Sequence, residues 1–153
     1  MAINMKKLIF LAVFFISFSA LSSVKPEQCI PVQNHVGTAT LFTMAEDFDI
    51  PSSQVDRSKT KTEILYTEPV NHELALIYGK KERILSGGEM SDDKTTAEQY
   101  ANGFMGNNAK NIIVKYNFFN HQGKENILII SAFVSDTDCA VRWNGYVVVK
   151  REF

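Results

Sequence analysis

The chain lacks any block of basic residues, and this absence argues against nucleic acid as a partner. Its 16 lysines and arginines stand against 17 acidic residues in a total of 153, whereas nucleic-acid-binding domains gather basic side chains on one face or helix. It also lacks the phosphate loop Gly-x-x-x-x-Gly-Lys-Ser/Thr and the nucleophile motif Gly-x-Ser-x-Gly. We therefore expect no nucleic-acid partner, no cofactor and no catalytic residue of these classes.

Histidine is scarce as well, and its spacing argues against a metal site. The only three are His35, His72 and His121, and none stands at metal-ligand spacing from another histidine or from a cysteine. The paired aspartates lie in loop-like segments without the Asp-x-Asp-x-Asp-Gly pattern of a calcium loop. We predict no metal site. A small hydrolase assembled from His72, His121 and a carboxylate stays open as an alternative.

Long hydrophobic runs are absent except at the N-terminus. There, Met5-Lys6-Lys7 precedes an apolar run of about 14 residues from Leu8 to Leu21, and Ala20-x-Ser22 fits a cleavage site. A positive start, a short apolar stretch and small residues at the end are typical of a secretory signal peptide, and a membrane-spanning helix needs roughly 20 residues. Residues 1–22 are therefore predicted to be a cleaved signal peptide, and no later segment is expected to span a membrane.

Cleavage would leave one small domain outside the cytoplasm. Removing 22 of 153 residues leaves 131, with 14 basic and 17 acidic side chains and a net charge of −3. A chain of this length is one ordinary domain, here 23–153. The Lys-Lys leader is typical of bacteria, so we expect a periplasmic or secreted bacterial protein.

Cysteine is nearly absent, and the two that exist are Cys29 and Cys139. Both lie in the exported part, where an oxidising compartment favours pairing. A Cys29–Cys139 disulfide would close a loop of about 110 residues, and chain entropy then contributes roughly 4–5 kcal/mol. There is no Cys-x-x-Cys motif, so a redox role is not predicted.

The C-terminal third has the clearest strand patterns. Apolar and polar residues alternate over 112–119, and 127–134 is almost wholly apolar, as in a strand covered on both faces. The β-rich runs 139–143 and 146–150 follow. These four segments, joined by short turns, predict an antiparallel meander.

The last two runs are separated by Asn144-Gly145. Asn-Gly between β-rich runs is the strongest short-range hairpin signal, because a type I′ turn needs two positive φ angles. In that register Trp143 faces Tyr146. Aromatic residues on a tight turn are good interface anchors, so Trp143, Asn144 and Tyr146 form the predicted binding surface. The competing interpretation is an aromatic pair that only stabilises the hairpin.

One amphipathic helix is predicted before the meander. Its apolar stripe consists of Ala97, Tyr100, Ala101, Phe104 and Met105. Thr95 and Glu98 fit a capping box, and Gly106 suits the position after the helix. This helix is expected to pack on one face of the sheet.

The N-terminal half is less clear. Strands are predicted at 36–42, 62–67 and 73–79, with a further short strand at 84–85 and a long loop over 44–59. The summed pattern predicts the α+β class, a mostly antiparallel sheet with one packed amphipathic helix.

These features favour a non-enzymatic binding protein, such as an inhibitor or an immunity-type protein, whose partner is a protein or an envelope component. The motivation is the missing catalytic pattern together with a compact, crosslinked domain. A purely structural envelope protein is the third alternative, and it predicts neither a pocket nor an exposed aromatic patch.

Overall fold

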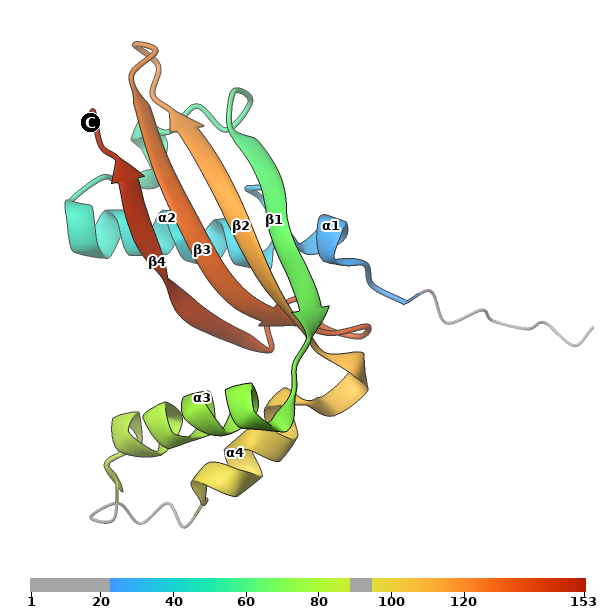
Figure 1. Cartoon of the computed structure of the whole chain (residues 1–153). Helices are drawn as coiled ribbons and strands as arrows, with labels where there is room; N and C mark the ends of the chain where they lie inside the picture. Colours follow the sequence, from blue (N-terminus) through green and yellow to red (C-terminus); the bar gives the residue numbers. More distant parts are fainter. Residues whose placement is uncertain (1–22, 89–94) are drawn as a thin grey trace, which may run out of the picture.

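A computed structural model describes residues 23–88 and 95–153 of the chain. The predicted signal peptide, residues 1–22, lies outside the described residues. Figure 1 shows a four-stranded sheet with one long helix across one face, and a pair of helices beyond one end of the strands. In the described part, no helix has the length and apolar character needed to cross a membrane.

The sheet is an antiparallel meander. Its strands, in spatial order, are β1 (Lys61–Pro69), β2 (Lys110–Phe119), β3 (Glu125–Val134) and β4 (Arg142–Lys150). The predicted α+β class and the four-strand antiparallel meander are confirmed. The makeup of the meander differs from the prediction, because its first strand comes from the N-terminal half and a helical pair is inserted between β1 and β2.

The hairpin predicted at Asn144-Gly145 is wrong. β4 runs through both residues as one strand and pairs with β3 on either side of them. Gly145 has a positive φ of 127°, but the pairing shifts by one residue here, so the glycine serves a β-bulge and not a turn. Trp143 and Tyr146 therefore lie along one edge strand instead of facing each other.

Residues 36–42, predicted to be a strand, belong to helix α2 (His35–Phe48). The β-branched residues of this segment suggested a strand because they favour one. Its buried positions nevertheless recur at helical spacing, at Val36, Thr40, Leu41 and Met44. The Thr40 hydroxyl donates to the Val36 carbonyl oxygen at 2.7 Å within the helix. Burial against the sheet thus outweighs a weak local propensity.

The loop predicted over 44–59 is shorter than expected, because α2 extends to Phe48. The remaining segment contains the 3₁₀ turn η1 (Ser52–Gln54). Val55 then pairs with Asn120, which attaches this segment to the turn after β2.

The main core lies between α2 and one face of the sheet. Along β2 and β3, every second residue is buried on this face, while most of the residues between them are half-buried. The largest side chains of this core include Met44, Ile112, Tyr116, Phe118 and Leu128. Burying a side chain of this size contributes about 1.5–3 kcal/mol. We call the opposite face, which α2 does not cover, the open face (Figure 1).

Residues 73–79, also predicted to be a strand, lie in helix α3 (His72–Leu85), which includes the short strand predicted at 84–85. The Asn71 side chain caps this helix by accepting a hydrogen bond from the Leu74 N–H at 2.9 Å. Asparagine is among the preferred residues at this position. The two strand predictions are therefore wrong, and a helix cap explains where α3 begins.

Helix α4 (Ala97–Phe104) forms where it was predicted, although its cap is Thr96, in a capping box with Gln99, rather than Thr95. It packs mainly against α3. The two helices approach so closely at Gly79 that a Cβ on this residue would lie 2.2 Å from the Ala97 carbonyl oxygen. The 3₁₀ turn η3 (Gly106–Asn108) leads from α4 into β2. The helix that covers the sheet is therefore α2, and α4 belongs to a separate helical pair.

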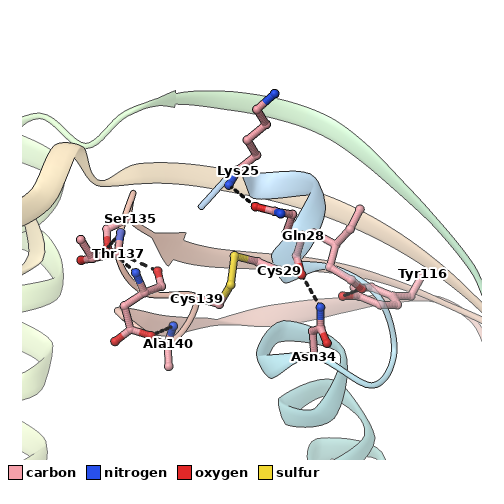
Figure 2. Close-up of a disulfide and its surroundings, with 11 residues drawn as sticks. Lys25, Gln28, Cys29, Asn34, Tyr116, Ser135, Thr137, Cys139 and Ala140 are labelled. Carbon is pink, nitrogen blue, oxygen red and sulfur yellow. Dashed lines mark hydrogen bonds between the residues drawn. A yellow bond between two sulfur atoms is a disulfide. The ribbon is translucent and has the colours of Figure 1, made fainter. Parts of the chain in front are cut away.

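The predicted disulfide between Cys29 and Cys139 is present (Figure 2). It joins the short helix α1 (Pro26–Cys29) to the loop between β3 and β4. A second tie lies close by, because the Tyr116 hydroxyl donates to the Ile30 carbonyl oxygen at 2.6 Å inside the core. Burial raises the pKa of Tyr116, so the hydroxyl stays neutral. The N-terminal segment is thus fixed to the sheet at two points.

Candidate functional site

The three residues of the predicted binding surface are placed on β4 in different ways. Trp143 and Tyr146 lie on the α2 side of the sheet, partly buried against the main core. The Tyr146 hydroxyl donates to the Asp47 carboxylate of α2 at 2.7 Å, and this hydrogen bond raises the pKa of Tyr146. Asn144 instead joins a polar network that leads toward α3.

That network fixes the first residues of β4. The Arg142 guanidinium donates to the Glu82 carboxylate of α3 at 2.8 Å and to the Asn144 side-chain oxygen at 3.0 Å. It also lies 4.7 Å from the centre of the Tyr78 ring. The Asn144 amide donates to the Ser131 hydroxyl of β3 at 3.1 Å. Since the arginine side chain is only 10% exposed, salt screens this ion pair less than a surface pair.

Trp143 lines a small hollow between α2 and the start of β4. The volume of the hollow is about 140 Å³, and its lining consists of His35, Val36, Ala39, Ala132, Cys139, Ala140, Arg142 and Trp143. The lining is mostly apolar. A cavity of about 150 Å³ holds a benzene ring, whereas pockets for whole small-molecule ligands are larger, at roughly 300–1,000 Å³. The Trp143 hollow is therefore about the size of a single side chain.

One side of α2 runs beneath β4. His35, Ala39 and Thr43 lie at i, i+4 and i+8, so they share a side of the helix, and Glu46 and Asp47 continue this line. The first two residues border the Trp143 hollow, and Asp47 bonds Tyr146. Figure 1 shows the C-terminal end of α2 projecting past β4, beyond the edge of the sheet. We call this side of the helix, from Ala39 to Asp47, the α2 shelf.

The outer edge of β4 exposes three consecutive valines. Val147 and Val149 are 62% and 56% exposed, and Val148 between them is 41% exposed. The run from Trp143 to Val149 contains no charged residue. Val147 pairs with the half-buried Ile129 and so lies on the open face, whereas Val148 pairs with the buried Leu128 on the α2 side. We call Val147–Val149 the β4 edge; sequence analysis recognised it as a strand but not as an exposed surface.

The histidines proposed for a hydrolase site do not meet. His72 lies at the start of α3, beside the end of the sheet where β2 begins, and His121 lies in the turn after β2. A ten-residue strand separates them, which corresponds to about 30 Å. His72 contacts the Glu98 carboxylate at 2.7 Å, but both side chains are half exposed. His121 contacts the Ser53 carbonyl oxygen at 3.2 Å.

A larger cleft of about 410 Å³ lies between α4 and the loop after β3. Two of its polar side chains already bind their own loop: Ser135 accepts from the Asp138 N–H and Asp138 accepts from the Ala140 N–H. Its described lining contains the Asp138 carboxylate and the hydroxyls of Ser135 and Thr137, but neither histidine nor cysteine. Within 23–88 and 95–153, no group of three or more metal-ligating side chains could hold an ion.

Comparison with family models, with curated proteins and with solved structures finds no match for this chain. The candidate site therefore depends on geometry alone: the β4 edge, the Trp143 hollow and the α2 shelf lie along one side of the domain.

Proposed function

We propose that this chain is an exported protein that binds another protein and catalyses no reaction. The observation that carries the proposal is the β4 edge, three exposed valines in a stretch of edge strand, from Trp143 to Val149, that carries no charge. Natural proteins protect edge strands with charges, proline or a covering element. An exposed apolar surface on a small domain is typical of an interaction site, and the Trp143 hollow beside it supplies a socket for one partner side chain.

Export is proposed from the leader-like pattern of residues 1–22 and from the Cys29–Cys139 disulfide. Disulfides persist in the periplasm and in secreted proteins and are rare in the cytosol. A small, crosslinked domain with one exposed edge suits an inhibitor or an immunity-type protein, and the partner is then another exported protein or an envelope component.

The test is partner capture with the full chain expressed from its own leader and recovered from the envelope fraction or medium. Val147→Lys places a charge on the β4 edge, and Ile84→Lys is the matched control on exposed α3 surface. We expect one partner to bind wild type and the control, and to bind the Val147→Lys variant at least tenfold more weakly, about 1.4 kcal/mol. Equal binding by all three proteins, or no specific partner, would refute the proposal.

A further inference from the structure

The β4 edge has backbone groups available for pairing. β4 is the last strand on its side of the sheet in the described part of the chain, so alternate residues direct their N–H and C=O groups away from β3. An extended segment of another chain can hydrogen-bond to such groups and extend the sheet, and pockets for its alternate side chains then give specificity.

Two bulges limit how much of β4 such a segment can use. The pairing with β3 shifts at Asn144 and again at Val149, which leaves Gly145–Val148 as the regular stretch between them. Bulges disrupt the ladder and twist an edge strand. The available surface therefore suits a short segment of a few residues more than a long strand pair.

The Trp143 hollow sets the side chain at one end of that segment. In an added strand every second side chain would lie on the α2 side of the sheet. The one nearest Trp143 would lie just past the Asn144 bulge, beside a mostly apolar hollow of about 140 Å³. A leucine or phenylalanine side chain matches this space.

The α2 shelf sets the charge at the other end. Glu46 and Asp47 are exposed at the C-terminal end of α2, whose last turn has no basic residue. The C-terminus of a helix carries a partial negative charge, so cations are stabilising there. Arg151 contacts this end by donating to the Phe48 carbonyl oxygen at 2.9 Å. A lysine or arginine on the α2 side of the added segment would face both carboxylates.

A second copy of this chain fits less well than a single segment. Two β4 strands paired about a two-fold axis would bring both α2 helices to the same side of the joined sheet. Each helix projects past its own β4 (Figure 1), so the two ends would compete for one space. The two pairs of Glu46 and Asp47 would also repel each other. An isolated strand brings neither a helix nor a negative charge.

From these observations we propose that the partner contributes one short extended segment that adds to β4 as a fifth strand, antiparallel to it. Its apolar side chain enters the Trp143 hollow, and its basic side chain lies over the α2 shelf. This inference rests on the proposed function, because it specifies the form of the protein that the β4 edge binds.

The probe is the peptide Lys-Val-Lys-Val-Phe-Val-Thr with blocked ends, added to the full chain recovered after export. Trp143 is the only tryptophan, so its fluorescence reports directly on the hollow. We expect saturable binding with a Kd below about 1 mM and a shift of the tryptophan emission. Absence of binding at that concentration would overturn the strand model.

Backbone pairing is tested with two N-methylated forms of the peptide, one blocking the odd amides and the other the even amides. Only alternate N–H groups of an added strand point at β4. We therefore expect one form to lose at least tenfold in affinity and the other to bind nearly as well as the parent. An equal effect of both forms would overturn strand addition and indicate contact through side chains alone.

The charge requirement is tested by a swap at Glu46. The Glu46→Lys variant should bind the lysine peptide about tenfold more weakly, and a peptide with glutamate in place of both lysines should recover that loss. Glu63→Lys, on the opposite edge, is the matched control and should change neither affinity. Equal responses of the two variants would refute the role of the α2 shelf.

The outcomes separate the two proposals. A captured partner that is lost with Val147→Lys but does not compete with the peptide supports the proposed function and overturns strand addition. Peptide binding without any captured partner overturns the proposed function. A concentration-dependent dimer that the peptide dissociates overturns the single-segment model in favour of a second copy.

Discussion

The two edge strands of the sheet meet solvent in different ways. β1 exposes Lys61, Glu63 and Glu68 and ends at Pro69, which has no N–H. β1 also exposes Leu65 and Tyr66, at 45% and 50%, but between these charges, whereas β4 exposes Val147–Val149 with no charged residue from Trp143 to Val149. Charges and proline on an edge prevent pairing with other chains, so β1 is protected although it is equally accessible. The comparison teaches that an exposed edge strand is not by itself a binding site. What distinguishes β4 is that its exposed stretch lacks the charges and the proline that protect β1.

The edges also differ in how they are held. The start of β4 is fixed by the Cys29–Cys139 bridge just before it and by the ion pair between Arg142 and Glu82. Its end is fixed by Lys150, whose ammonium lies 3.0 Å from the carboxylates of both Glu125 and Glu152. A strand anchored at both ends loses less conformational freedom on binding, which favours affinity.

The largest effect is expected from removing the disulfide, by Cys29→Ser with Cys139→Ser. Because the bridge closes a loop of 110 residues, the free energy of unfolding should fall by roughly 4–5 kcal/mol. Denaturant unfolding measures this loss. Hydrogen exchange should show that β4 amides lose protection before those of β1 and β2, and uniform loss across the sheet would contradict the claim that the bridge anchors the open edge.

Gly145→Ala should be the next largest effect, since it strains the bulge in β4. The glycine has a φ of 127°, and forcing another residue into such a conformation costs about 1–3 kcal/mol. Gly103→Ala is the matched control, because the site lies in α4 with open space around it and alanine should stabilise the helix by up to about 1 kcal/mol. Thermal unfolding should give opposite signs, and the same sign for both would refute the bulge argument.

A smaller effect is expected from making β1 resemble β4. Glu63→Val with Glu68→Val removes two charges from an exposed edge, and surface changes of this kind alter folding stability by less than about 0.5 kcal/mol. The variant should nevertheless associate at high concentration, because the protection against edge pairing is gone. Sedimentation velocity measures this, and Val147→Lys, which leaves the charges of β1 in place, should associate no more than wild type.

The smallest effect is a pH dependence of the end of β4. Hydrogen bonds from the Asn117 amide and from Lys150 lower the pKa of Glu125. The Glu125 backbone N–H, followed by Lys150, lowers the pKa of Glu152. Their stabilisation is therefore complete above the ordinary glutamate pKa of about 4.3 and is lost as pH falls through the lower folded values. Glu125→Gln with Glu152→Gln should flatten the fall in Tm below pH 4.3, and an unchanged slope would contradict this.

Sequence patterns predicted β1, β2, β3 and α4 but failed for α2 and α3. The apolar residues over 112–119 recur with the period of a strand, and those from Ala97 to Met105 recur with the period of a helix. Each pattern therefore identifies one kind of element. Residues 73–79 are a short apolar run, and periodicity alone cannot assign such a run to a strand or a helix. The side chain of Asn71, which caps α3, was the overlooked signal. The Asn144-Gly145 hairpin failed because pairing with β3 on both sides of the dipeptide outweighed the local turn preference.

For the candidate site, the sequence identified Trp143 but not its surroundings. Ala39 of α2 lies beside Trp143, and more than a hundred residues of chain separate them. No local pattern brings these residues together, because the contact exists only once α2 has packed across the sheet. The same holds for Asp47 beneath Tyr146.

The sequence by itself determined the strands with a clear period of two and, from them, the α+β class. It also determined the disulfide, because the chain has only two cysteines and each can pair only with the other. Only the tertiary structure decided which helix covers the sheet, that β4 is continuous, and that its valines remain exposed at an unprotected edge. The reason is physical, since burial and strand pairing are long-range interactions whose energies exceed the local preferences that a sequence pattern reports.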